Sequence, residues 1–252
     1  MTKAEQQKPS IQDALLDPGS PDLGDNFPAL CNKRNNRFAG RLRAEEDEKR
    51  LEPARAANRR EHSLIGVLAI QGDYAAHAAA LEEAGAEPCE IRKPEELAGL
   101  DGLVIPGGES TTMLKFLKPR FFETLEEFCR SHPVFGTCAG AILLAREVRN
   151  PAQRSLGLLD AVVERNAYGR QIDSAILTAE TTLPGGPLEM VFIRAPRIAE
   201  VGPGVEVLAR RDGFPALVRQ GRLMAATFHP ELSSDRRVHR LFVGIAAAAH
   251  LK

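Results

Sequence analysis

The sequence predicts an α/β fold with a central, mostly parallel and doubly wound sheet. Between residues 64 and 145, short apolar runs alternate with helical patterns, which is typical of parallel strands joined by helical crossovers. Residues 64–70 are almost continuously apolar, as expected of a strand buried on both faces. After Leu158 the chain changes to short strand-like runs separated by Gly- and Pro-rich turns. These observations favour a three-layer sandwich with a small, largely antiparallel part.

The individual elements follow in chain order. Expected strands cover residues 64–70, 88–91, 103–105 and 133–135, and then 159–164, 174–178, 190–193, 205–209, 216–219 and 223–227. Expected helices cover residues 74–84, 121–130, 141–145 and about 235–250. Gly85 follows the first helix as its C′ residue, and the closing helix carries apolar residues at helical spacing.

Length and composition limit the functions that the chain could have. The chain has 252 residues, of which 43% are hydrophobic, enough for one sizeable core. The formal net charge of −1 gives no indication of a nucleic acid or an anionic membrane as partner. Four widely spaced cysteines without a CxxC pair argue against a zinc site and a disulfide framework. They favour a reducing, cytoplasmic location, and we see no signal peptide and no membrane-spanning stretch.

Residues 1–62 differ from the rest. They are rich in Gln, Asn, Pro and charged residues and have little apolar surface to bury, so we expect a disordered or partly helical extension. A partner-binding arm and a wrongly chosen start site are the alternatives. The globular domain is expected over residues 63–252.

The candidate nucleophile is Cys138. A short apolar run, a glycine and a threonine precede it, and a small residue and a glycine that open a helical stretch follow it. A strand–turn–helix of this kind exposes a nucleophile at the carboxyl end of a strand. It also places the sulfur at a helix N-terminus, which favours the thiolate. The alternative is a small buried cysteine in a tight turn.

A thiolate nucleophile needs a base, and the base needs a group that orients it. His229 and Glu231 lie two residues apart across Pro230, at the end of a predicted strand. In an extended chain, residues i and i+2 point the same way, so Glu231 is expected to face the His229 ring. The other histidines lack an obvious orienting group and are read as structural or surface residues; they are His62, His77, His132, His239 and His250.

Acyl transfer also needs donors for an oxyanion. The backbone N–H of Ala139 is one candidate and the Gly107-Gly108 pair supplies the other, because glycine allows close approach and a peptide flip. The polar loop of residues 164–171 and the strand end at Arg194 contribute arginines that suit a carboxylate. Surface salt bridging is the alternative for these arginines.

Seven stretches, in order along the chain, carry a resemblance to class I, triad-type glutamine amidotransferases. They are residues 71–72, 106–113, 135–140, 163–166, 169–174, 192–196 and 228–232. The cysteine turn and His-Pro-Glu are shared across that class. The Gly-Gly-Glu-Ser-Thr, Arg-Asn…Gly-Arg-Gln and Phe-Ile-Arg-Ala-Pro stretches resemble one subfamily more closely, the glutaminase subunits of pyridoxal 5′-phosphate synthase.

The resemblance implies a flavodoxin-like amidotransferase fold and hydrolysis of L-glutamine to glutamate and ammonia. It implies a (β/α)₈ synthase partner that receives the ammonia in a hetero-oligomer, and no metal or cofactor in the glutaminase. Cys138, His229 and Glu231 would be nucleophile, base and orienting residue. The residues that would bind glutamine are Gly108, Glu109, Ser110, Arg165, Ile193 and Arg194. Gly108 and Ala139 would be the oxyanion donors.

The chain departs from the family pattern at three positions. Ala175 and Ile176 stand where the family usually has Phe-Glu, and Ala76 stands where Glu usually precedes the histidine of the first helix. Two alternatives to this glutaminase remain. One is another class I amidotransferase that feeds a different synthase, and the other is a non-catalytic protein that only docks onto a synthase.

Overall fold

The computed structural model describes residues 62–165 and 174–250, with only the main chain of His250. Within these ranges, seven strands form the main sheet in the spatial order β10-β11-β12-β4-β3-β1-β2. Their bounds are β1 Leu64–Leu68, β2 Glu87–Ile91, β3 Gly102–Ile105, β4 Val134–Thr137, β10 Glu206–Arg211, β11 Phe214–Gln220 and β12 Leu223–Ala226. The strands from β12 to β2 are parallel, and β10, β11 and β12 pair antiparallel.

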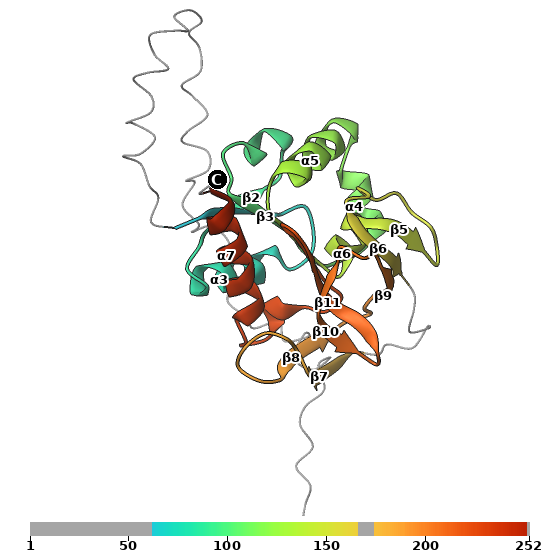
Figure 1. The fold of residues 1–252 in the computed structure, drawn as a ribbon. Helices are drawn as coiled ribbons and strands as arrows, with labels where there is room; N and C mark the ends of the chain where they lie inside the picture. The colour runs from blue at the N-terminus through green and yellow to red at the C-terminus, as the bar shows by residue number, and fades with distance from the viewer. Residues whose placement is uncertain (1–61, 166–173, 251–252) are drawn as a thin grey trace, which may run out of the picture.

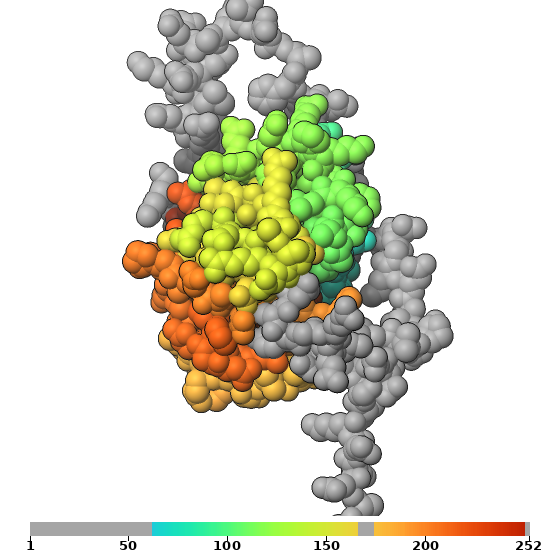
Figure 2. Space-filling model, turned by 90° about the vertical axis from the view of Figure 1, so that its right-hand side faces the viewer, coloured from blue at the N-terminus to red at the C-terminus, as the bar shows by residue number. Residues whose placement is uncertain are grey.

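The remaining strands form two small sheets. A three-stranded sheet has the order β5-β6-β9, and β7 pairs with β8. Their bounds are β5 Ala145–Arg149, β6 Leu159–Glu164, β7 Ala175–Ala179, β8 Leu188–Phe192 and β9 Arg197–Val201. On the face seen in Figure 2, the yellow β5–β6 segment lies between the green helical segment and the orange β10–β11 segment.

The helices cover both faces of the main sheet, so the fold has three layers (Figure 1). Their bounds are α3 Tyr74–Glu83, α4 Ser110–Phe116, α5 Pro119–Ser131, α6 Ala139–Leu144 and α7 Arg237–His250, with 3₁₀ turns η1 Pro94–Leu97 and η2 Pro230–Leu232. Helices α3 and α7 share one apolar core, and α4, α5 and α6 share the other. This α/β architecture agrees with the fold class predicted from the sequence.

Strand β3 shows why the two cores form. Leu103 and Ile105 point into the core under α4, α5 and α6, whereas Val104 points into the core under α3 and α7. Successive side chains of a strand alternate between the faces of a sheet, so a strand covered on both faces needs apolar residues throughout. Each fully buried Leu or Ile side chain of this kind stabilises the fold by about 1.5–3 kcal/mol.

Several sequence expectations were wrong in detail. The first strand ends at Leu68 rather than at residue 70, and the helix after Cys138 ends at Leu144, where β5 begins. Helix α4 and strands β5 and β9 were not predicted. The last strand, β12, is not part of an antiparallel half alone, because it pairs parallel with β4 on its other side. This pairing brings the chain after β12 to the same sheet edge as the chain after β4.

Other expectations lie outside the described residues or stay predictions. Residues 1–61 and 166–173 lie outside the described ranges, so the N-terminal extension and most of the polar loop that begins at Glu164 remain sequence-based. The division into an extension and a domain over residues 63–252 stays a prediction. Ile176, at the departure from the family pattern, lies on β7 with 55% of its surface exposed. In the described part of the chain, no helix is long and apolar enough to cross a membrane.

Candidate active site

Cys138 occupies a sharp turn between β4 and α6. Its φ of 47° and ψ of −101° lie in a region that non-glycine residues rarely adopt. Its backbone N–H donates to the Ala226 carbonyl at 2.8 Å, and its own carbonyl accepts from the Ile142 N–H at 3.2 Å. Strain of this kind persists where the surrounding structure holds it, and such positions cluster at functional sites. The turn therefore has the strand–elbow–helix form that the sequence predicted, but the expected exposure was wrong, because Cys138 is buried, with 6% of its surface exposed.

Two glycines allow the turn to close. A Cβ at Gly136 would lie 2.6 Å from the Gly140 carbonyl, and a Cβ at Gly140 would lie 2.1 Å from the Ile105 carbonyl oxygen. Helix α6 thus packs directly against the main chain of β3 and β4. Any larger side chain at either glycine would push the helix away from the sheet.

His229 follows β12 and reaches the same sheet edge as Cys138. Its backbone N–H donates to the Val191 carbonyl at 2.8 Å. Its Nδ1 atom lies 2.7 Å from Oε1 of Glu231. The sequence predicted this contact from an extended chain, and that geometry was wrong, because Pro230 begins the 3₁₀ turn η2. The turn folds Glu231 back under the histidine ring instead.

Contacts with each other and with neighbouring side chains shift the pKa values of His229 and Glu231. Burial lowers the pKa of His229, but hydrogen bonds to the side chains of Cys138 and Glu231 outweigh burial and raise it to about 10. Burial raises the pKa of Glu231, but the nearby His77 and His229 rings outweigh burial and lower it to about 2. At neutral pH the site therefore holds an imidazolium between a carboxylate and the cysteine sulfur.

His77 was read from the sequence as structural or surface, and the structure places it against the site. It is fully buried on α3, and its Nε2 atom lies 3.2 Å from Oε2 of Glu231. Its Nδ1 atom lies 3.2 Å from Nε2 of His239, also fully buried, on α7. The sequence signal was weak, because His77 is far from both partners along the chain and meets them only when α3 and α7 pack together.

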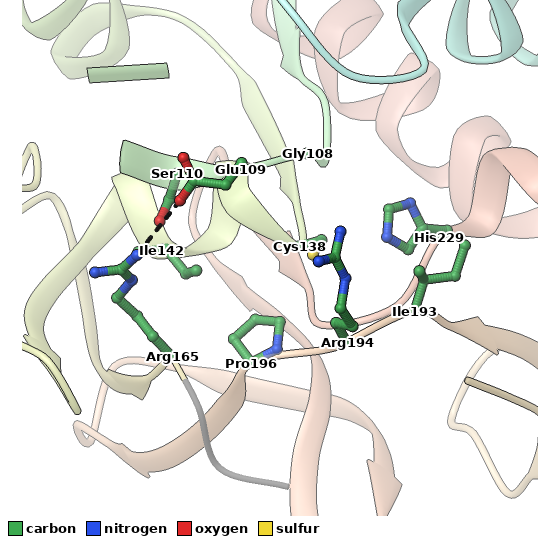
Figure 3. Close-up of a pocket in the computed structure, with 10 residues that line it drawn as sticks. All are labelled: Gly108, Glu109, Ser110, Cys138, Ile142, Arg165, Ile193, Arg194, Pro196 and His229. Carbon is green, nitrogen blue, oxygen red and sulfur yellow. Dashed lines mark ion pairs between the residues drawn. The ribbon is translucent and has the colours of Figure 1, made fainter. Parts of the chain in front are cut away.

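A cavity of about 260 Å³ opens over Cys138 and His229 (Figure 3). Its lining contains every residue expected to bind glutamine, together with Ile142 and Pro196. The full lining is Gly108, Glu109, Ser110, Cys138, Ile142, Arg165, Ile193, Arg194, Pro196 and His229. These residues come from separate stretches of the chain, which the carboxyl ends of neighbouring strands bring together.

The Glu109 carboxylate already forms hydrogen bonds within the chain. It caps α4 by accepting hydrogen bonds from the backbone N–H and the hydroxyl groups of Thr111 and Thr112. These bonds lower the pKa of Glu109 to about 2. Arg165 Nη2 lies 3.6 Å from its Oε1 (dashed line in Figure 3). Within the described residues, Glu109 therefore ties the α4 N-terminus to one arginine of the cavity.

The second arginine lies on a strained turn after β8. Arg194 has a φ of 44°, and Ile193 and Pro196 flank it in the cavity wall. Arg194 and Cys138 both line the cavity (Figure 3). The cavity thus carries guanidinium groups from two separate segments, which suits an anionic ligand.

Of the two expected oxyanion donors, Ala139 follows Cys138 in the chain and Gly108 lines the same cavity. Ala139 is the first residue of α6 and is fully buried. Gly108 has a φ of +125°, and a Cβ on it would lie 3.0 Å from Gln71 Nε2. The Gln71 side chain donates to the Glu109 carbonyl at 2.9 Å, and the Gly107 carbonyl packs against Gly72, where a Cβ would lie 2.0 Å from its oxygen. The loop is thus held by the segment after β1.

Metal binding has no obvious place among the described residues. They contain no group of three or more His, Cys, Asp or Glu side chains arranged to hold a metal ion. What the arrangement offers is a cysteine nucleophile, a histidine able to move a proton, a carboxylate that orients it and an arginine-flanked cavity. This set is suited to acyl transfer through a covalent intermediate.

The profile of the SNO glutamine amidotransferase family matches residues 67–247. Pyridoxal 5′-phosphate synthase subunit PdxT of Koribacter versatilis is 65% identical over 179 residues, which cover 71% of this chain and 93% of the relative. The protein of the same name from Solibacter usitatus is 56% identical, over 71% of this chain and 97% of the relative.

Solved structures with the same fold agree with this family match. A crystal structure of a glutamine amidotransferase superposes with a TM-score of 0.68 at 48% identity, covering 73% of this chain and 98% of the other. The structure of PurLQS from Thermotoga maritima shares the fold, with a TM-score of 0.53 at 15% identity over 76% of this chain and 98% of the other. By its sequence, its fold and the residues around Cys138, the chain belongs to the SNO glutamine amidotransferase family.

Proposed function

We propose that the chain is the glutaminase subunit of a pyridoxal 5′-phosphate synthase and hydrolyses L-glutamine to L-glutamate and ammonia. The observation that carries this proposal is that Cys138 and His229 line one cavity, with His229 Nδ1 2.7 Å from Oε1 of Glu231, in a chain of this family. Relatives that share 56% and 65% of the aligned residues bear the name of that synthase subunit.

The charges of the site indicate the order of steps. The Cys138 thiolate attacks the side-chain amide carbon of glutamine, and the carbonyl oxygen takes up the electron pair. The backbone N–H groups of Gly108 and Ala139 stabilise that oxyanion. The C–N bond then breaks as His229 donates its proton to the departing nitrogen, which leaves as ammonia, and a thioester remains on Cys138.

The second half returns the site to its starting state. His229, now neutral, takes a proton from water, and the resulting hydroxide attacks the thioester carbon. The C–S bond breaks, glutamate leaves, and the Cys138 sulfur again lies beside the His229 imidazolium. Glu231 holds the same ring tautomer throughout, because its carboxylate accepts the Nδ1 proton.

The rest of the cavity suits the amino-acid end of the substrate. Arg165 and Arg194 would bind the α-carboxylate, and Ser110 and Ile193 would line the remaining wall. Of the two acceptors that suit the α-ammonium, Glu109 and a backbone carbonyl, the main chain is favoured, because the Glu109 carboxylate is occupied in capping α4.

The ammonia would pass to a (β/α)₈ synthase partner in a hetero-oligomer, in the cytoplasm and without nucleic acid, membrane or cofactor. Because glycine permits a peptide flip at the Gly107-Gly108 pair, we infer that the oxyanion site is completed only when the partner is bound. Such control would prevent the waste of ammonia by the isolated chain. The glutaminase of another class I amidotransferase, or a non-catalytic docking protein, would share the fold but not both the chemistry and the partner.

The deciding experiment measures glutamate formation by the chain with and without its synthase partner. We expect turnover that rises strongly with the synthase and that Cys138→Ala abolishes, while Cys89→Ala, which removes a cysteine outside the cavity, keeps it. Turnover in Cys138→Ala would refute the thioester mechanism. Equal rates with and without the synthase would refute partner control, and association with a different synthase would favour the first alternative.

A further inference from the structure

We propose that His77, supported by His239, is a positioning residue that holds the Glu231 carboxylate in the orientation that the His229 ring requires. This inference rests on the proposed function, since it concerns how the same site is kept ready. Neither histidine touches the cavity within the described residues, so their effect passes through Glu231.

The carboxylate of Glu231 has two oxygens with different neighbours. Oε1 accepts from His229 at 2.7 Å. Oε2 is buried and has no well-aligned hydrogen-bond donor among the described residues; His77 Nε2, at 3.2 Å, approaches it. The same nitrogen lies 3.1 Å from the hydroxyl oxygen of Thr137, the residue before Cys138. A buried carboxylate needs compensation on both oxygens, and His77 Nε2 is the nitrogen placed to give it to the second, beside its hydrogen bond with Thr137.

The contacts favour one arrangement of the protons on the two histidines. If His77 Nε2 carried a lone pair, it would face the lone pairs of a buried carboxylate, which is repulsive. Nε2 therefore carries the proton, and Nδ1 is an acceptor for the Nε2–H of His239 at 3.2 Å. His239 Nδ1, which has no hydrogen-bond partner among the described residues, is then a bare lone pair.

With the protons in this order, the side chains form a series of donor-to-acceptor contacts. It runs from His239 on α7 through His77 on α3 to Glu231 on η2, and then through His229 toward Cys138. In this arrangement each ring donates toward the Glu231 carboxylate, which holds the carboxylate in place. Burial lowers the pKa of both His77 and His239, in keeping with neutral rings. The packing of α3 against α7 is thereby linked to the orientation of His229.

The experiment compares two substitutions of His77 in the complex with the synthase. His77→Leu removes the donor, and His77→Gln replaces it with an amide N–H. We expect His77→Leu to lower kcat by about 10–100-fold, by analogy with the loss of an outer hydrogen bond to a metal-binding residue, with KM unchanged. His77→Gln should recover most of kcat. Leu81→Ala is the matched control, because Leu81 is buried on the same helix one turn later.

A second measurement separates positioning from a loss of packing. The His229 Nδ1 proton can be followed by NMR in ¹⁵N-histidine-labelled protein and identified by its absence in His229→Gln. We expect its resonance to shift or broaden in His77→Leu and in His239→Leu, but not in Leu81→Ala. If His77→Leu does not fold, the comparison of His239→Leu with His239→Gln takes its place.

The outcomes are distinct. An unchanged His229 proton in the leucine variants, or a kcat loss in Leu81→Ala equal to that in His77→Leu, would overturn the positioning role. Failure of His77→Gln to restore either readout would do the same. Absence of glutaminase turnover in the wild-type complex would instead refute the proposed function, while the NMR comparison would still test the contact of His77 with Glu231.

Discussion

Gly107 lies so close to the His229 ring that a Cβ on this glycine would be 2.4 Å from Cε1 of the imidazole and 3.3 Å from Cβ of Cys138. We therefore expect Gly107→Ala to displace the His229 ring and to reduce kcat by at least about 100-fold, the loss expected from misplacing a reacting group by an ångström. Glutaminase turnover of the complex measures this.

The control is Gly204→Ala. A Cβ at Gly204 would meet no atom within 4 Å, so its turnover should equal that of the wild type. Normal turnover in Gly107→Ala would mean that the His229 ring is not held where it lies here.

Gly140, with Gly244 as its control, tests the packing of the turn at Cys138. In Gly140→Ala the new methyl group would meet the Ile105 carbonyl oxygen at 2.1 Å, and we expect a loss of about 1–3 kcal/mol in the free energy of unfolding from overpacking. Gly244→Ala, on α7 with open space around it, should gain up to about 1 kcal/mol from helix propensity. Urea unfolding measures both, and equal changes would contradict the close packing of α6 on β3.

His229 gives a pH dependence at the alkaline end. Its pKa is raised from an ordinary 6.5 to about 10, so its contribution to stability is fully present below about pH 6.5. That contribution is lost as the pH rises through about 10. NMR titration of the ring should show an imidazolium throughout the neutral range, and His229→Gln should lose less stability on going from neutral to alkaline pH. Titration of the ring near pH 6.5 would contradict the ion pair.

Glu109 gives a pH dependence of stability with the opposite sign. Because its pKa is lowered from 4.5 to about 2, the stability that it adds as the cap of α4 is present above about pH 4.5 and is lost as the pH falls toward 2. Glu109→Gln should therefore be less stable than the wild type at neutral pH, and the gap should narrow in acid. Glu123→Gln, at an exposed position of α5, should show no such gap; a gap independent of pH would rule out the charged cap.

The sequence predicted those parts of the site that are local in the chain. The elbow at Cys138 is encoded by adjacent residues, because a glycine on each side and an apolar strand before it allow only a sharp turn. The His229–Glu231 contact was also predicted, although the chain reaches it through a 3₁₀ turn. Contacts within two or three residues leave a pattern that can be read before the fold is known.

The parts that were not predicted depend on distant packing. His77 on α3 meets Glu231 near the other end of the domain sequence, and no local pattern distinguishes it from any other buried histidine. Helix α4 begins with Glu109 as its cap, directly after two glycines that read as loop. Strand β9 carries Arg197 and Glu200, so its charged residues conceal a strand that is held by pairing with β6.

The pairing of β12 with β4 has one more consequence. The Cys138 N–H donates to the carbonyl of Ala226, the last residue of the strand that leads to His229. Cys138 and His229 therefore follow the ends of two adjacent strands in the middle of the sheet. Strands in the core of a fold have the highest opening free energies, so we expect the two strands that lead to Cys138 and His229 to keep these residues together as one unit. A partner that switches this chain on would therefore act on the loops around that unit, and the reacting pair itself would stay assembled while the enzyme is idle.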